Sequence, residues 1–324
     1  MTASTEDSSQ PAAAAASDEQ APGYIELGYA FAAIGAILFS TKAVAIRLAY
    51  TEPVDAATLL ALRMALAIPF YVAIGALAIA DFRRRKTPLP ALKTMVHAAL
   101  VGALGYWFAS YSDFLGLEFI SAQFERLILF TYPLFVVIFG ALFFRQPMRL
   151  RALGAIGVSY AGLALIFVEK LESGGSNAVV GAGLVLASAL AFAFYQLLAK
   201  KVIAVMGPRL FTCVAMSGAA VGAFLTFLVS HPVADLAVSP RVFGLSVFLA
   251  IGATVLPSFF LNAALHRISA QSNAAIGTVS PVVTIVLAAI FLGERLSPTG
   301  IFGAVLVLIG VGWFTLADRP ARSR

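Results

Sequence analysis

The chain has 324 residues, of which 60% are hydrophobic and 12% are charged. Soluble domains carry about 25% charged residues, so this composition excludes one or two soluble globular domains and indicates a polytopic membrane protein. The net charge of +6 does not indicate a nucleic-acid-binding protein, because the Lys and Arg residues stand at the ends of apolar runs, where such residues orient membrane helices.

The apolar runs are continuous rather than alternating, which excludes a transmembrane β-barrel. A helix needs about 20 apolar residues to cross the hydrocarbon core of a bilayer, and the sequence offers ten runs of about that length. We therefore expect an all-α membrane protein with ten transmembrane helices. They are predicted at approximately 26–49, 55–80, 93–114, 119–143, 150–168, 178–199, 208–230, 241–263, 269–292 and 299–317.

The positions of Lys and Arg predict the orientation of these helices. If the amino terminus is cytosolic, fifteen Lys and Arg residues fall in cytosolic segments and four fall on the other side. Both termini are then cytosolic, in a multi-pass protein of the bacterial inner membrane. Residues 1–24 lack a basic start before an apolar core, so we expect a disordered cytosolic tail and no cleaved signal peptide. Residues 318–324 form the second tail.

An internal repeat organises the apolar part of the chain. The tetrapeptide Ile120-Ser121-Ala122-Gln123 returns 148 residues later, at 268–271, and the same shift superimposes Pro133 on Pro281. A weaker match relates 28–47 to 181–200. We predict two five-helix domains, 25–170 and 176–317. Because five is odd, the two halves must cross the membrane in opposite senses, which is the inverted-repeat arrangement typical of secondary transporters.

Several short motifs lie along the two repeats. They are FSTKAVAIR at 39–47, LLALR at 59–63, SYSDFLGL at 110–117, ERLILF at 125–130, VLPS at 255–258, GTVSP at 277–281 and FLGE at 291–294. In combination they resemble the drug/metabolite transporter superfamily, specifically the ten-helix EamA-type transporters. The resemblance implies a proton- or gradient-linked carrier, or a facilitator, of small metabolites, and it includes bacterial exporters of amino acids. The sequence departs from many relatives at 144–146, which reads Phe-Arg-Gln where they have Leu-Gly-Glu, and at Phe39, where they have Trp.

Four ionisable residues fall inside the predicted membrane helices, namely Lys42, Arg63, Glu125 and Arg126. Such groups are costly in a bilayer and are functional candidates. With about 1.5 Å of rise per residue, all four lie at one level, in the outer half of the membrane. One interpretation is an ion-pair network in which Glu125 pairs with Lys42 or Arg63. The other is a solvated cavity for a substrate with a carboxylate, because three cations face one carboxylate. Glu125 is also a candidate proton-coupling group.

Polar and aromatic residues extend the candidate site. Tyr106, Trp107 and Ser110 lie at helical spacing and are either cavity residues that stack on a substrate or anchors at the membrane interface. The second half offers cavity residues that could equally form interhelical hydrogen bonds. These are Tyr195, Gln196 and Asn273, of which Asn273 matches Glu125 in the repeat, and Ser258 and Asn262, which follow the kink expected at Pro257.

Pro133 and Pro281 are predicted hinges, because they bend matched helices at equivalent places. No P-loop is present, the three His residues are isolated, and no acidic or Cys cluster accompanies them, so we expect no metal, no cofactor and no enzyme activity. Cys213 is a single core residue.

The sequence thus predicts a secondary transporter that moves small metabolites across the inner membrane by alternating access. Amino acids, including aromatic ones, and related carboxylates are the expected substrates, and export is the expected direction. The expected partners are the substrate and the lipid bilayer, with coupling to a proton gradient and no nucleic acid. The alternative is a passive facilitator or gated channel for small polar metabolites.

Overall fold

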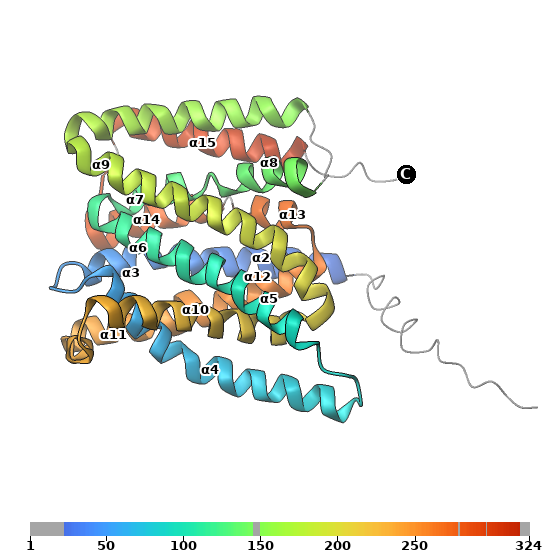
Figure 1. Cartoon of the computed structure of the whole chain (residues 1–324). Helices are drawn as coiled ribbons and strands as arrows, with labels where there is room; N and C mark the ends of the chain where they lie inside the picture. The colour runs from blue at the N-terminus through green and yellow to red at the C-terminus, as the bar shows by residue number, and fades with distance from the viewer. Residues whose placement is uncertain (1–22, 145–149, 278, 296, 318–324) are drawn as a thin grey trace, which may run out of the picture.

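The computed structural model describes residues 23–144, 150–277, 279–295 and 297–317, and these ranges contain helices and no strand (Figure 1). Six helical stretches of the described residues are long and apolar enough to cross a membrane, and some of them consist of two or more consecutive helices. Two shorter apolar helices follow near the end of the chain. The prediction of an all-helical membrane protein is therefore confirmed. The two predicted tails lie almost wholly outside the described residues, as do Arg145 and Gln146.

The first part of the chain forms mostly helices that are shorter than the predicted crossings. They are α2 (Tyr24–Ser40), α3 (Lys42–Ala49), α4 (Ala56–Arg84), α5 (Leu92–Gly102), the π-helix η1 (Ala103–Phe108), α6 (Ala109–Phe119), α7 (Ala122–Leu129) and α8 (Tyr132–Phe144). The helical run α9 (Leu150–Met206) continues through the loop predicted after 168 and turns back on itself (Figure 1).

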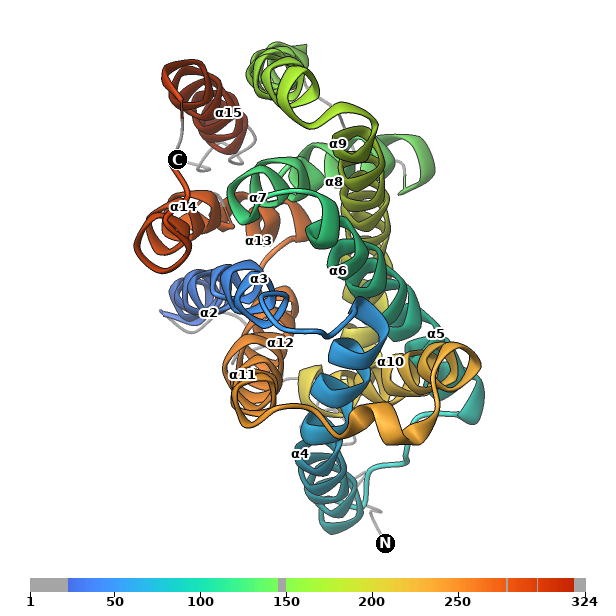
Figure 2. The same cartoon turned by 90° about the vertical axis from the view of Figure 1, so that its left-hand side faces the viewer.

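The second part repeats this pattern of short helices. It contains α10 (Pro208–Ser230), the 3-10 helix η2 (Val233–Leu236), α11 (Pro240–Ala250), the π-helix η3 (Ile251–Val255), α12 (Leu256–Arg267), α13 (Ala270–Ile276), α14 (Val279–Leu292) and α15 (Pro298–Ala317). In Figure 2, α4 and α15 lie toward opposite ends of the bundle, and α7 and α13 lie between them.

Local sequence accounts for several helix ends. Asp55, Ser121 and Ser239 are N-cap residues whose side chains accept a hydrogen bond from the backbone N–H three residues later, which satisfies one of the free donors of the first turn. Gly207 adopts a φ of 73°, which glycine tolerates, and Pro208 then begins α10 at a position where the missing N–H costs nothing.

The predicted long helices are interrupted near their middles. The first breaks at Thr41, between α2 and α3, and the fourth breaks at Phe130 and Thr131, between α7 and α8. Pro133 is the second residue of α8, and proline is tolerated in a first turn, so it starts a helix instead of kinking one. The third and eighth predicted helices contain π-helical segments, which often occur at functional sites.

The element boundaries follow the 148-residue shift seen in the sequence. The segments η1 and η3 begin at residues 103 and 251, and the helices before them begin at 92 and 240. Similar contacts are made by Arg47 and Lys200, the last residues of the weaker match between 28–47 and 181–200: Arg47 donates to the carbonyl oxygen of Leu117 at 3.0 Å, and Lys200 donates to that of Leu265 at 2.5 Å. These matches extend the sequence repeat to backbone geometry and to side-chain contacts.

Candidate functional site

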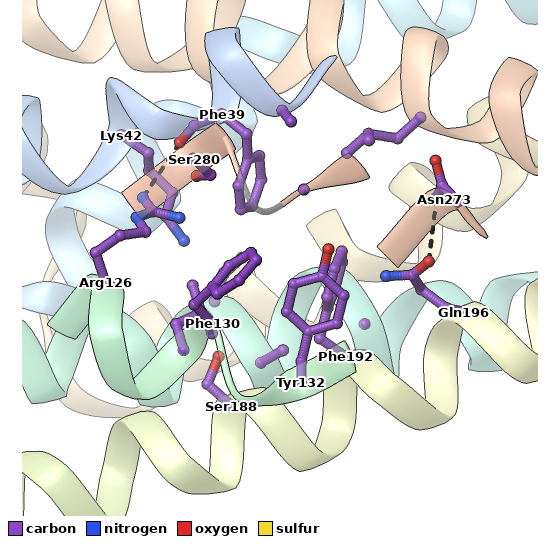
Figure 3. A pocket seen from close by; sticks show the side chains of 17 residues that line it. Phe39, Lys42, Arg126, Phe130, Tyr132, Ser188, Phe192, Gln196, Asn273 and Ser280 are labelled. Carbon is purple, nitrogen blue, oxygen red and sulfur yellow. Dashed lines mark hydrogen bonds between the residues drawn. The ribbon is translucent and has the colours of Figure 1, made fainter. Parts of the chain in front are cut away.

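A pocket lies between the two parts of the chain and is lined by helices of both. Helices α2, α3, α6, α7 and α8 line it from the first part, and α9, α12, α13 and α14 from the second. Figure 3 shows cationic side chains at one end, aromatic rings in the middle and a pair of amides at the other end. The charged end is defined by Lys42 and Arg126, and the amide end by Gln196 and Asn273.

The pocket lies where the helices are interrupted. Phe39 and Lys42 lie on either side of the break at Thr41. Phe130 lies in the break between α7 and α8, and Tyr132 follows it. Breaks leave backbone carbonyls without helical partners, and side chains from other helices bond them: Arg126 donates to Phe39 O at 3.3 Å and Tyr132 donates to Ala274 O at 3.4 Å. Non-helical backbone at membrane depth is tolerated in such protein-lined places.

The charged end contains two ion pairs. Lys42 Nζ lies 2.6 Å from Asp113 Oδ2, and Arg126 Nε lies 3.7 Å from Glu125 Oε2. Both cations line the pocket, where they face the ring of Phe39 at 4.6 Å and 5.8 Å. Asp113 and Glu125 are fully buried and are not among the lining residues, so cations are the only charged side chains that the described residues present to the pocket.

The predicted pairing of Glu125 with Lys42 or Arg63 is wrong. The partner of Lys42 is Asp113. The predicted third helix ends at residue 114, which would put Asp113 at the membrane surface, but its side chain is fully buried. The cluster therefore contains three cations and two carboxylates, a surplus of one positive charge. Among the described residues, Arg63 makes no ion pair: its Nε and Nη2 atoms are buried without a hydrogen-bond partner, and its guanidinium lies 4.9 Å from the Phe114 ring.

Four aromatic rings form the middle of the pocket (Figure 3). Phe39 from α2 stacks on Phe192 from α9 with a centroid distance of 6.1 Å, and Tyr132 meets Phe192 edge-on at 5.1 Å. Phe130 meets Tyr132 edge-on at 6.1 Å. Such rings bind apolar or aromatic groups through large contact areas and preferred ring geometries.

The amide end has unused hydrogen-bonding capacity. Asn273 Nδ2 donates to Gln196 Oε1 at 3.1 Å, and Asn273 Oδ1 is buried without a partner among the described residues. The two side chains are 3% and 2% exposed. A buried polar atom without a partner is costly, so this end favours a polar group of a ligand.

The structure places five of the predicted site residues in the pocket lining: Lys42, Ser110, Arg126, Gln196 and Asn273. Glu125 lies behind Arg126, and Arg63 lies outside the lining. Five others belong to contacts between helices: Tyr106, Trp107, Tyr195, Ser258 and Asn262.

Most of these residues form hydrogen bonds between side chains of different helices. Tyr195 donates to Asn262 Oδ1 at 2.6 Å, and its hydroxyl lies 3.3 Å from that of Tyr106. The hydroxyls of Tyr71 and Ser258 lie 2.9 Å apart. Trp107 Nε1 donates to Thr226 on α10 at 2.9 Å. These residues join α4, α9, α10 and α12 beside the pocket and stabilise its walls.

Sequence reasoning missed several pocket residues. Phe130, Tyr132, Ser188, Phe192 and Ser280 line the pocket but sit in apolar runs that resemble ordinary lipid-facing helix. Asp113, which lies behind the charged end, did carry a readable signal, because it is three residues after the candidate Ser110 and therefore near the same helix face.

No group of three or more His, Cys, Asp or Glu side chains that could hold a metal ion is found among the described residues. The side chains that line the pocket offer anion binding, aromatic contact and neutral hydrogen bonding.

The comparisons with known proteins show which family the chain belongs to. The model of the EamA-like transporter family matches residues 26–168 and again 179–316. An uncharacterized transporter of Bacillus subtilis, YcbK, is 30% identical over 85% of this chain and 88% of its own length. A probable amino-acid metabolite efflux pump of Salmonella typhimurium is 28% identical over 59% of this chain and 66% of its own length.

A solved structure described as the crystal structure of a protein shares the fold. Its TM-score is 0.63 at 19% identity, covering 91% of this chain and 99% of the other. The two matches to the family model, which span most of the chain, and the similarity to YcbK identify the chain as a membrane-spanning transporter of small molecules that belongs to the EamA-like transporter family.

Proposed function

We propose that the protein is a secondary transporter that binds small carboxylates, with amino acids and their relatives as the candidate class, in the pocket between its two halves. The observation that supports this most strongly is the charged end, where two cations line the pocket and both carboxylates lie behind them. A cationic pocket end with an uncompensated positive charge nearby favours an anionic ligand.

The proposed architecture is ten membrane crossings in two inverted five-helix repeats, spanning 25–170 and 176–317. The two matches to the family model support it, as does the 148-residue shift between equivalent helices. The fold-back of α9 supports counting it as two crossings (Figure 1). Inverted repeats of this kind place the substrate at the repeat interface.

The proposed mechanism is alternating access, in which one half rocks against the other around the pocket. Pro133 and Pro281 are the proposed hinges. Pro133 begins the helix that follows the break at Phe130 and Thr131, and a short non-helical segment can absorb the dihedral changes of a hinge. Pro281 lies 148 residues later, at the matched position.

The proposed location is the bacterial inner membrane, with both termini cytosolic, because Lys and Arg are concentrated on that side. The proposed direction is export, which rests on the relative from Salmonella typhimurium named as a probable amino-acid metabolite efflux pump. Glu125 is the proposed proton-coupling group, because it is a fully buried carboxyl beside a pocket-lining cation.

Proteoliposomes test this proposal. Uptake of radiolabelled amino acids and arylalkanoic acids would be measured with and without a pH gradient, and again after loading with unlabelled substrate. A carrier gives counterflow, with faster uptake into loaded vesicles, whereas a passive channel gives none. Glu125→Gln is expected to remove the pH dependence. Absence of transport for both classes would contradict the proposed function.

A further inference from the structure

We infer that the physiological substrate is a carboxylate that lacks an α-ammonium group and carries a hydroxyl or carboxamide at its far end, which Asn273 and Gln196 recognise. This inference rests on the proposed function: it keeps the carboxylate class and excludes the α-amino acids within it. It follows from the different chemistry of the two pocket ends (Figure 3).

The charged end suits a carboxylate but not the ammonium of an α-amino acid. In an α-amino acid the ammonium is attached next to the carboxylate, so both groups would lie beside Lys42 and Arg126. Among the described residues no Asp or Glu lines the pocket, and the nearest acids, Asp113 and Glu125, are fully buried and paired with the two cations. An added ammonium would meet two like charges without a counter-ion.

The amide end suits a neutral group that both donates and accepts hydrogen bonds. Asn273 and Gln196 share one hydrogen bond, and one amide oxygen of the pair is left buried without a partner. Reversing both amides, which look alike in shape, gives the pair the same single hydrogen bond and still leaves one of its two carbonyl oxygens outside that bond. A hydroxyl or carboxamide can satisfy both carbonyl and N–H groups, whereas a methyl group or hydrogen atom leaves the acceptor unpaired.

The pocket wall formed by α9 is long enough for an extended molecule with an aromatic or apolar middle. Ser188 and Gln196 both line the pocket from α9, and at 1.5 Å per residue they lie about 12 Å apart along that helix. Between them Phe192 stacks against Phe39. The probes of choice are therefore arylalkanoic acids with a polar group on the ring.

The experiment is a titration of the purified full-length protein in detergent. The probes are phenyl-substituted acetate, propanoate and butanoate, each with and without a para hydroxyl, so that one chain length matches the pocket. Phenylalanine and tyrosine are the same two propanoates with an α-ammonium added. At the best chain length, we expect the hydroxyl to tighten binding by about tenfold to one hundredfold. We expect each amino acid to bind at least about tenfold more weakly than its propanoate.

Two variants locate the effect of the hydroxyl. Asn273→Leu and Gln196→Leu should each bring the affinity for the hydroxylated acid down to that of the plain acid in the same variant, so that the ratio of the two affinities falls to about one. Asn262→Leu is the matched control, because Asn262 is equally buried and hydrogen-bonded but does not line the pocket. In Asn262→Leu, the ratio of the affinities for the hydroxylated and the plain acid should equal that of the wild type. This ratio does not depend on the fraction of folded protein.

The outcomes separate this inference from the proposed function. Tighter binding of the amino acids than of their propanoates, or a hydroxyl effect that survives both leucine variants, would overturn the inference while carboxylate binding stands. If no acid binds, or Arg126→Gln does not weaken any of them, the proposed function fails and the inference fails with it.

Discussion

The charged end and the amide end lie at opposite ends of the pocket and differ in chemistry (Figure 3). Asn273 stands 148 residues after Glu125, so a carboxyl in one half matches an amide in the other. The charged end has counter-ions buried behind its cations, whereas the amide end leaves a neutral acceptor free. In the proposed inverted repeat, Glu125 and Asn273 are matched positions, and their different side chains make the two ends of the pocket different.

The largest expected effect on stability comes from the ion pair behind the charged end. Asp113→Asn leaves Lys42 charged and buried without a counter-ion, so we expect the free energy of unfolding to fall by about 3–5 kcal/mol. Equilibrium unfolding in mixed micelles measures this. The double variant Lys42→Met with Asp113→Leu removes both charges and should recover most of the loss; equal losses in the single and double variants would show that the pair is not the cause.

A substitution of Arg63 tests whether the same end carries a surplus positive charge. Because its Nε and Nη2 atoms are buried without partners, Arg63→Met removes an uncompensated charge and keeps much of the side-chain volume. We expect the unfolding free energy to rise by about 1–3 kcal/mol. A marked fall would mean that Arg63 has a stabilising counter-ion, and the surplus positive charge would be wrong.

The amide end depends on close packing behind it. A Cβ atom at Gly105, in the π-helix η1, would lie 2.3 Å from Cγ of Tyr195, which neighbours Gln196. We expect Gly105→Ala to cost about 1–3 kcal/mol through overpacking. Gly244→Ala is the control, because nothing lies within 4 Å of its Cβ position, and thermal unfolding should show it unchanged or slightly stabilised.

The smallest effect is expected at the hydroxyl of Tyr195. Tyr195→Phe removes the donor to Asn262 Oδ1, so a loss of about 1–2 kcal/mol in unfolding free energy is expected, without a change in carboxylate affinity. A large loss of affinity would instead place Tyr195 among the ligand-binding residues.

The sequence predicted the helical membrane architecture because apolar runs and charge positions carry that information directly. The sequence also predicted that Lys42, Glu125 and Arg126 lie at one depth in the membrane, and in the structure they lie together at the charged end. It could not predict the helix breaks at Thr41 and Phe130, because neither position carries a helix-breaking residue. Nor could it separate Phe130 or Phe192 from lipid-facing phenylalanines, because only packing between the two halves makes them line a pocket.

Asp113 shows why side-chain pairing was harder to predict than depth. The prediction counted it near the aqueous end of its helix, but α6 continues to Phe119 and buries the carboxyl against Lys42. A helix end displaced by one turn was enough to change the inferred surplus of positive charge from two to one.

The most direct test of the account is the affinity of a plain arylpropanoate for wild-type protein and for Arg126→Gln, measured by titration in the same detergent. If Arg126 binds the carboxylate at the charged end, the variant should bind about 10-fold to 100-fold more weakly. Glu125→Gln combined with Arg126→Gln provides a variant without an unpaired buried acid and should bind as weakly. Unchanged affinity in both folded variants would contradict the assignment of the pocket as a carboxylate site.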